Sequence, residues 1–143
     1  MNKKKLLIAA ALSLGIIMMG YLCNPETIFA QECRIIRMLG GPEHSTIMLE
    51  PETLFTSKGD CVVWFNRVQA KEIQVIFEEG KKCSDGTMAP MGFSYDQNNC
   101  YVTNYIPFAG TSSLRFMEKG TYNYVVKAKG LPSLPVKGQI VVE

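Results

Sequence analysis

The sequence contains very little histidine and no closely spaced cysteine pair. Its 143 residues include one histidine, His44, and none of its five cysteines stands in a CxxC spacing. A structural zinc site needs four Cys or His ligands in short spacings, and catalysis by a nucleophile needs a neighbouring base. The sequence therefore excludes a zinc ribbon and an attached c-type haem, and it gives no support to an enzyme. We expect His44, in the turn GGPEHST, to be solvated.

Long runs of like charge are also missing. Three of the 15 Lys and Arg residues and one of the 13 Asp and Glu residues lie in residues 1–30, so the remaining 113 residues carry 12 of each sign. A near-neutral domain gives no basis for a nucleic-acid partner or for an anionic-membrane partner.

The first 30 residues have the features of a secretory signal peptide. Lysines at 3–5 precede an apolar run over residues 6–22, and Asn-Pro-Glu at 24–26 leads to Ala30. This order predicts export with cleavage after Ala30. Two alternatives stay open: a retained membrane anchor, and lipidation at Cys23, which the bulky Leu22 disfavours. All three place residues 31–143 outside the cytoplasm, in the periplasm or the extracellular space.

Four cysteines remain after residue 30: Cys33, Cys61, Cys83 and Cys100. An even number in an exported chain predicts two disulfides. Three pairings are possible, and the count alone does not choose among them. Each bridge would contribute about 3–4 kcal/mol through the loop that it closes.

No long part of the chain after residue 30 has a helical apolar period. Short apolar runs such as CVVWFN, EIQVIFEE and TYNYVVKAK alternate with Gly, Pro, Asn and Asp. This spacing predicts an all-β sandwich or barrel formed by one domain, residues 31–143. Alternation along the strands predicts two sets of residues that share a face: Tyr122, Tyr124 and Val126, and Ile73, Val75 and Phe77.

Residues 80–110 break this pattern, because the stretch is long, rich in turns and weakly periodic. A loop of this length is usually functional or has a small structure of its own. Cys83 and Cys100 stand near its two ends and would close it into a lobe, which favours pairing them.

Two groups of side chains in this insertion invite a functional interpretation. Met88 and Met91 are three residues apart, and thioethers suit Cu(I), although Met also fills gaps in small lobes. Aromatic side chains crowd the same stretch, and they either cover the sandwich or form a contact surface. They are Phe93, Tyr95, Tyr101, Tyr105 and Phe108.

Two longer stretches resemble the cupredoxins, the plastocyanin and pseudoazurin family. LEPETLFTSKGDCVVWFN is similar to the family pattern xFxPxxxxVxxGxxVxWxN, and FMEKGTYNYVVKAKGLPSLPVKGQIVVE is similar to FxxxGxYxYxCxxHxxxxMxGxIxV. The resemblance covers residues 33–143 and implies a Greek-key, cupredoxin-like β-sandwich. In that fold the first and third strands are neighbours, which implies a Cys33–Cys61 bridge. Cys83–Cys100 is then the second bridge and bounds the insertion.

The resemblance also implies where a type 1 copper site would lie. The first His position falls on Ile73 or on Glu72 before it, the Cys position on Val126, the second His position on Lys129 and the Met position on about Leu134. Such a site needs two imidazoles, a thiolate and a weak axial thioether. None of these positions keeps its ligand, and a lysine cation repels Cu(II).

We therefore predict an exported, non-catalytic cupredoxin-like domain without cofactor, acting as a binding or structural module in the cell envelope. We expect its partner to be another envelope protein, with membrane contact only through an uncleaved N-terminal segment. The alternative is a copper-handling or electron-transfer protein that uses Met88 and Met91, with or without His44. The candidate partner-binding residues are Tyr95, Tyr101, Tyr105, Lys127 and Lys129.

Overall fold

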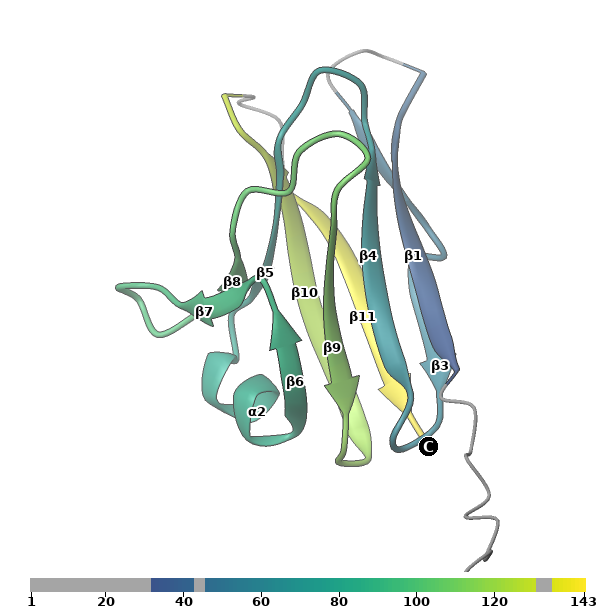
Figure 1. The fold of residues 1–143 in the computed structure, drawn as a ribbon, viewed down its shortest axis with the longest axis vertical. Helices are drawn as coiled ribbons and strands as arrows, with labels where there is room; N and C mark the ends of the chain where they lie inside the picture. The colour runs from purple at the N-terminus through teal and green to yellow at the C-terminus, as the bar shows by residue number, and fades with distance from the viewer. Residues whose placement is uncertain (1–31, 43–45, 131–134) are drawn as a thin grey trace, which may run out of the picture. The chain divides into compact units, whose positions relative to one another are not determined.

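Two β-sheets pack face to face in the computed structural model, which describes residues 32–42, 46–130 and 135–143 (Figure 1). The predicted signal peptide (residues 1–30), His44 and Leu134 fall outside the described residues. The first sheet has the strand order β2-β1-β4-β9-β6. Its strands are β1 (Cys33–Gly40), β2 (Ile47–Glu50), β4 (Cys61–Arg67), β6 (Thr87–Met91) and β9 (Thr111–Phe116).

The second sheet has the order β3-β11-β10-β5-β8-β7. The chain crosses between the sheets at nearly every connection from β3 to β10, so neighbours in space are often distant in sequence. The predicted all-β Greek-key sandwich is thereby confirmed. The strands of this sheet are β3 (Thr53–Thr56), β5 (Ile73–Phe77), β7 (Phe93–Tyr95), β8 (Tyr101–Thr103), β10 (Gly120–Ala128) and β11 (Val136–Val142).

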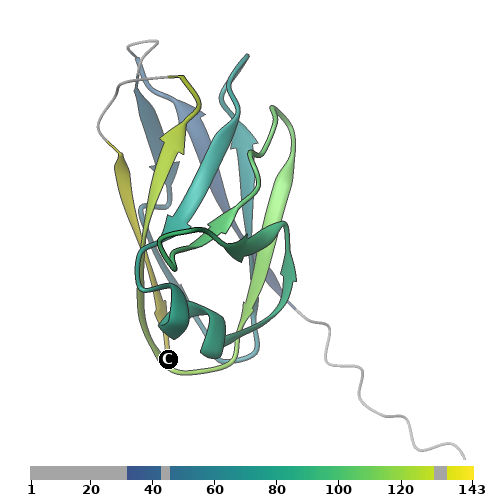
Figure 2. The same cartoon turned by 90° about the vertical axis from the view of Figure 1, so that its left-hand side faces the viewer.

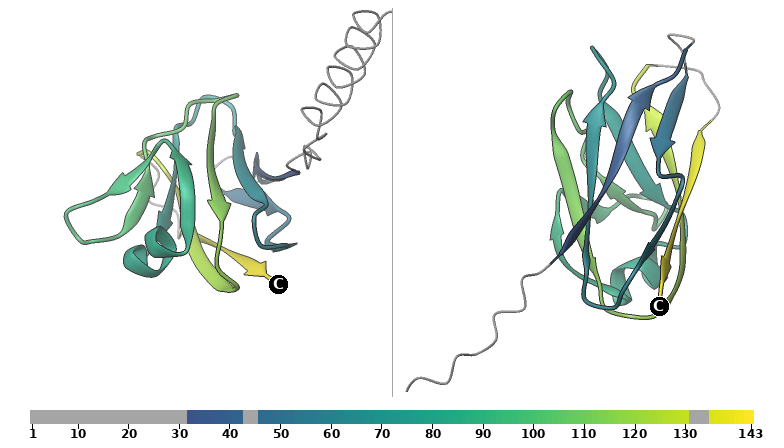
Figure 3. Two further views of the ribbon diagram at one scale, coloured as in Figure 1. Left: turned by 60° about the horizontal axis from the view of Figure 1, so that its bottom comes forward. Right: turned by 90° about the vertical axis from the view of Figure 1, so that its right-hand side faces the viewer.

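A parallel pair, β1 and β4, brings two predicted partners together. Cys33 lies opposite Cys61 in the register of these strands, and their sulfurs form a disulfide with the Cα atoms 4.5 Å apart. The right panel of Figure 3 faces the side of the sandwich where β1 runs beside β4. The predicted Cys33–Cys61 bridge is confirmed. With 28 positions between its ends, it contributes about 3–4 kcal/mol in the chain-entropy account.

The core lies between the sheets and is centred on aromatic side chains. Trp64 is fully buried and packs edge-on against Phe77 and Tyr124. The ring of Tyr124 occupies the space in which a side chain at Gly138 would stand. Both predicted sets of face-sharing residues on β5 and β10 are buried, so the alternation predicted for these strands is confirmed.

The insertion does not form a separate lobe. A short helix, α2 (Gly80–Asp85), leads into β6, which extends the first sheet beside β9. The β7–β8 hairpin then extends the second sheet beside β5. Figure 2 shows α2 next to this hairpin. The insertion therefore completes one edge of each sheet, because its short strands gain backbone partners there.

The predicted Cys83–Cys100 disulfide is wrong: both residues are free thiols. Cys83 is buried and lies near the hydroxyls of Tyr101 and Tyr122, and this burial raises the pKa of its thiol to about 12. Cys100 is half-buried and has charged groups as neighbours, Asp96, Glu78 and Lys127. The two thiols thus lie in different surroundings.

A tight turn before β4 supplies a pH-dependent contribution to stability. The Asp60 carboxylate accepts hydrogen bonds from the backbone N–H of Ser57 (3.0 Å) and the hydroxyl of Thr56 (2.8 Å). These bonds hold the pKa of Asp60 below its usual value, with a smaller contribution from the positive charge of Arg34. The charged form is therefore favoured in the folded chain.

We expect Asp60→Ala to lower the free energy of unfolding by about 1 kcal/mol at neutral pH, through the lost hydrogen bonds. A depressed carboxyl pKa stabilises the fold above the unfolded value near pH 4 and loses this effect as pH falls through the folded value. The difference between wild type and variant should therefore shrink below about pH 4 in urea titrations at several pH values. Asp60→Asn is the control, because its amide oxygen accepts but does not titrate in this range. A difference that stays constant down to pH 2 would contradict this account.

Candidate functional site

The positions implied for copper ligands meet at one end of the sandwich. Ile73 begins β5 and Val126 lies on the neighbouring strand β10, where Ala128 is opposite Ile73 and Val126 is opposite Val75. Lys129 follows directly, and its backbone N–H donates to the carbonyl of Glu72 (2.9 Å). The structure thus brings Ile73, Val126 and Lys129 together, while Leu134 is outside the described residues.

The buried members of this set cannot hold a metal ion. Ile73 and Val126 are both fully buried hydrocarbon side chains within the core. The backbone of Ile73 is committed as well, because it exchanges two hydrogen bonds with Ile106 (2.9 and 2.7 Å). A type 1 site needs imidazole and thiolate ligands. The donor chemistry at these positions does not fit copper.

Two exposed residues of this set, Glu72 and Lys129, form an ion pair. The ammonium of Lys129 donates to a carboxylate oxygen of Glu72 at 2.6 Å. The same ammonium lies 5.1 Å from the centre of the Tyr105 ring, within range of a cation–π contact. The hydrogen bond and charge of Glu72 raise the pKa of Lys129, so this end of the sandwich carries a stable cation.

Asn66, for which the sequence suggests no role, connects two segments at this end of the sandwich. It is fully buried at the end of β4, and its amide N–H groups donate to the carbonyls of Lys71 (2.9 Å) and Ile106 (2.8 Å). Its side-chain oxygen accepts from the backbone N–H of Val68 (2.8 Å). One side chain therefore ties the β4–β5 loop to the segment that carries Tyr105. The sequence could indicate that an Asn at the end of a strand precedes a turn. It could not indicate the hydrogen bond to Ile106, because Ile106 is forty residues away in the chain.

The structure does not bring the candidate partner-binding residues together in one place, and one of them is buried. Tyr105 and Lys129 lie together at the end described above, and both are exposed. Tyr95 is exposed at the other end of β8, where it packs on Tyr101 with ring centres 5.3 Å apart. Tyr101 is only 7 % exposed, so its prediction as a contact residue is wrong. Its ring stacks on Phe93 and lies near the Cys83 thiol, so it is buried and not available to a partner.

Lys127 lies at neither of these two places. It lies opposite Gln74 in the register of β10 and β5, is exposed on the outer face of the second sheet and has the Cys100 thiol as a neighbour.

The methionine pair lies on the edge strand β6. A β-bulge between the two residues places Met88 opposite Arg115 and Met91 opposite Ser113. Because directly opposed residues share a face, both thioethers point to the outer face of the first sheet. Among the described residues, no three His, Cys, Asp or Glu side chains are grouped closely enough to hold a metal ion.

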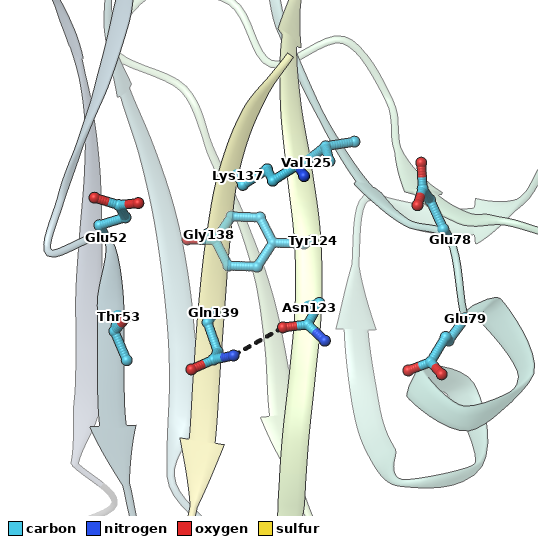
Figure 4. Close-up of a pocket in the computed structure, with 10 residues that line it drawn as sticks. All are labelled: Glu52, Thr53, Glu78, Glu79, Asn123, Tyr124, Val125, Lys137, Gly138 and Gln139. Carbon is cyan, nitrogen blue, oxygen red and sulfur yellow. Dashed lines mark hydrogen bonds between the residues drawn. The ribbon is translucent and has the colours of Figure 1, made fainter.

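A shallow groove of about 530 Å³ lies over the outer face of the second sheet (Figure 4). Its middle is occupied by an amide pair, in which Gln139 donates to Asn123 at 2.9 Å. The carboxylates of Glu52, Glu78 and Glu79 line the groove, with Lys137 among them. The groove is therefore acidic, in contrast to the end that carries Lys129.

Within the described part of the chain, no helix has the length and apolar content needed to cross a membrane.

Among known proteins, only solved structures are similar to this chain. No family model and no curated protein matches the sequence. Among the solved structures similar to this chain is an oxidised methionine-to-leucine mutant of amicyanin, 23 % identical, covering 77 % of this chain and 81 % of that one with a TM-score of 0.47. Another is an oxidised methionine-to-lysine mutant of amicyanin, with 22 % identity, coverage of 78 % and 82 %, and a TM-score of 0.48. A third is the Cu(I) form of a methionine-to-alanine mutant, with 20 % identity, coverage of 80 % and 85 %, and a TM-score of 0.48.

Proposed function

We propose that this chain is an exported, cupredoxin-like domain that holds no type 1 copper and acts as a non-catalytic binding module in the cell envelope. The observation that carries the proposal is the Glu72–Lys129 ion pair above two buried aliphatic residues, at the positions where the family motif has its ligands. The motif resemblance and the parallel β1–β4 pair support the assignment of those positions.

The binding surface in this proposal is the end of the sandwich around Tyr105 and Lys129. Tyr105 is 45 % exposed, and Phe108 on the same loop is 51 % exposed. Tyr is enriched at protein interfaces because it combines a large rigid ring with a polar group. The Glu72–Lys129 pair and the Asn66 hydrogen bonds hold the elements beside this surface in a defined geometry. A preorganised aromatic surface with a fixed cation fits recognition of another protein.

Copper addition tests the metal part of the proposal. Purified residues 31–143 should stay colourless and bind no stoichiometric metal when Cu(II) is added, because hydrocarbon side chains offer no lone pairs. Bound copper is measured by elemental analysis and by visible absorption, with an intact cupredoxin as the positive control. An intense blue colour would overturn the proposal.

Crosslinking in the native envelope tests the binding part. A captured protein should be lost in a Tyr105→Ala, Lys129→Glu double variant and kept in Tyr95→Ala, which removes an equally exposed tyrosine elsewhere. Equal capture by both variants would show that the end around Tyr105 and Lys129 is not the contact surface.

A second candidate function is copper handling through Met88 and Met91. The observation that favours it is the bulge in β6, which turns both thioethers to one exposed face. Stoichiometric Cu(I) binding that disappears in a Met88→Leu, Met91→Leu double variant would support this function. Binding that persists in the double variant would exclude it.

A further inference from the structure

The outer face of the first sheet is unusually apolar for an exposed surface. Trp64, Ile36 and Leu114 are fully buried, so the residues that alternate with them on β4, β1 and β9 point outward. Met88 and Met91 join them across the β6–β9 pairing. The apolar residues of this outer face are Ile35, Leu39, Met48, Val63, Phe65, Met88 and Met91.

Four of these residues are strongly exposed, at 46 % for Met88, 47 % for Ile35, 52 % for Met48 and 67 % for Met91. Single exposed apolar residues are ordinary, but a contiguous group of them marks an interaction surface. Ile35, Val63 and Met91 lie in one row across the sheet, because Ile35 is opposite Val63, Val63 opposite Ser113 and Ser113 opposite Met91. Apolar residues therefore span the face from β1 to the β6 edge, with the polar Ser113 of β9 between Val63 and Met91.

The same face carries mainly positive charge. Arg37, Arg67 and Arg115 alternate with its apolar residues, and the carboxylate of Glu50 is paired with Arg37 at 3.3 Å. Among the described strand residues that point outward on this face, the charged groups are therefore three guanidinium groups and one carboxylate. The outer face of the second sheet is mixed in charge, because three carboxylates and Lys137 line its groove and Lys127 is exposed on the same face.

The chain enters the sandwich at β1, a strand of this sheet. Cys33, the first residue of β1, is bonded to Cys61 on the outer side. Only ten residues, 23–32, separate β1 from the apolar run at residues 6–22. Ten residues reach at most about 35 Å when fully extended. Until any cleavage occurs, the domain is thus tethered within this distance of whatever bilayer holds the apolar run.

We propose that the outer face of the first sheet docks on the surface of an anionic lipid bilayer. Arginines beside exposed Met and Ile side chains match an interface that has anionic headgroups above acyl chains. A second copy of this chain fits less well, because two identical faces would oppose their guanidinium groups. The proposal does not depend on the absence of copper.

Vesicle sedimentation tests the proposal with residues 31–143, because the apolar run would bind lipid by itself. This part contains both sheets, the core and the disulfide, and it forms one compact unit. The domain should sediment with phosphatidylcholine vesicles that contain phosphatidylglycerol, and far less with phosphatidylcholine alone. Arg67→Gln should lower the partition coefficient about fivefold, the effect of one basic residue near an anionic surface. Binding should also weaken as salt screens the charges.

Met91→Asp should abolish most of this binding, because it places a carboxylate at the most exposed apolar position of the face. Phe55→Asp is the matched control: Phe55 is 63 % exposed on the outer face of the second sheet, so its replacement should leave the binding unchanged. Two results would overturn the proposal. One is that the wild-type domain does not sediment with anionic vesicles. This includes the case in which the face joins two copies of the chain, which sedimentation velocity would show as a dimer that Met91→Asp separates. The other is an equal loss of binding in Phe55→Asp and Met91→Asp.

Discussion

Replacing Asn66 with alanine is expected to lower the free energy of unfolding by about 2–4 kcal/mol. Asn66 is fully buried and makes three hydrogen bonds to backbone groups of Lys71, Ile106 and Val68. A buried polar group left without its partner costs about 1–3 kcal/mol. The Ile106 carbonyl keeps a second bond, from the N–H of Ile73, so the largest losses fall on Lys71 and Val68.

Urea unfolding followed by Trp64 fluorescence measures this change, since Trp64 is the single tryptophan of the chain. Asn123→Ala is the matched control: it removes the same side chain from an exposed hydrogen bond with Gln139 and should change stability by less than about 0.5 kcal/mol. The same Asn66→Ala variant should also loosen the loop that carries Tyr105, which faster amide exchange around residues 104–110 would report. Equal destabilisation by both Asn variants would show that the buried hydrogen bonds of Asn66 contribute no more to stability than the exposed bond of Asn123.

Replacing Trp64 with alanine is expected to have a still larger effect, about 3–5 kcal/mol. The indole ring is fully buried on β4 and contacts Phe77, Phe93 and Tyr124 with ring centres 5.4–5.8 Å apart. These partners come from β5, from β7 in the insertion and from β10. Its removal would therefore leave a cavity shared by the main part of the second sheet and the inserted hairpin.

Circular dichroism during thermal unfolding measures this loss, because the variant has no tryptophan to report by fluorescence. Trp64→Phe is the control, since it keeps an aromatic ring and should lose clearly less stability than the alanine variant. The indole N–H faces the Tyr124 hydroxyl, but neither atom meets hydrogen-bond geometry, so its removal in Trp64→Phe should cost little. A phenylalanine variant as unstable as the alanine variant would show that the polar atom, rather than packing, dominates.

The two pairs of cysteines show why one pairing could be predicted and the other could not. The motif resemblance placed the strands of Cys33 and Cys61 side by side, and a parallel register then brings the two sulfurs together on one face. For Cys83 and Cys100 the only argument was their position at the two ends of an insertion. That position was not enough, because α2 directs Cys83 into the core while Cys100 has charged groups as neighbours.

For the candidate sites too, some features could be predicted from the sequence and others could not. The positions that the resemblance implies for copper ligands followed from motif spacing, and the structure brings Ile73, Val126 and Lys129 together. The partners of Lys129 did not follow from the sequence, because Glu72 and Tyr105 belong to distant segments. Tyr101 was wrongly expected at the surface, since the composition of the insertion did not reveal which of its aromatic residues cover the core.

Alternation within single strands was sufficient to predict an all-β fold and the inward faces of β5 and β10, because a strand places successive side chains on opposite sides. The distribution of charge over the surface became visible only in the tertiary structure. The residues after position 30 are balanced at 12 of each sign, yet folding gathers arginines on the outer face of the first sheet and carboxylates over the second. Those side chains come from strands that only the Greek-key crossings bring together, so no local pattern in the chain could have revealed either surface.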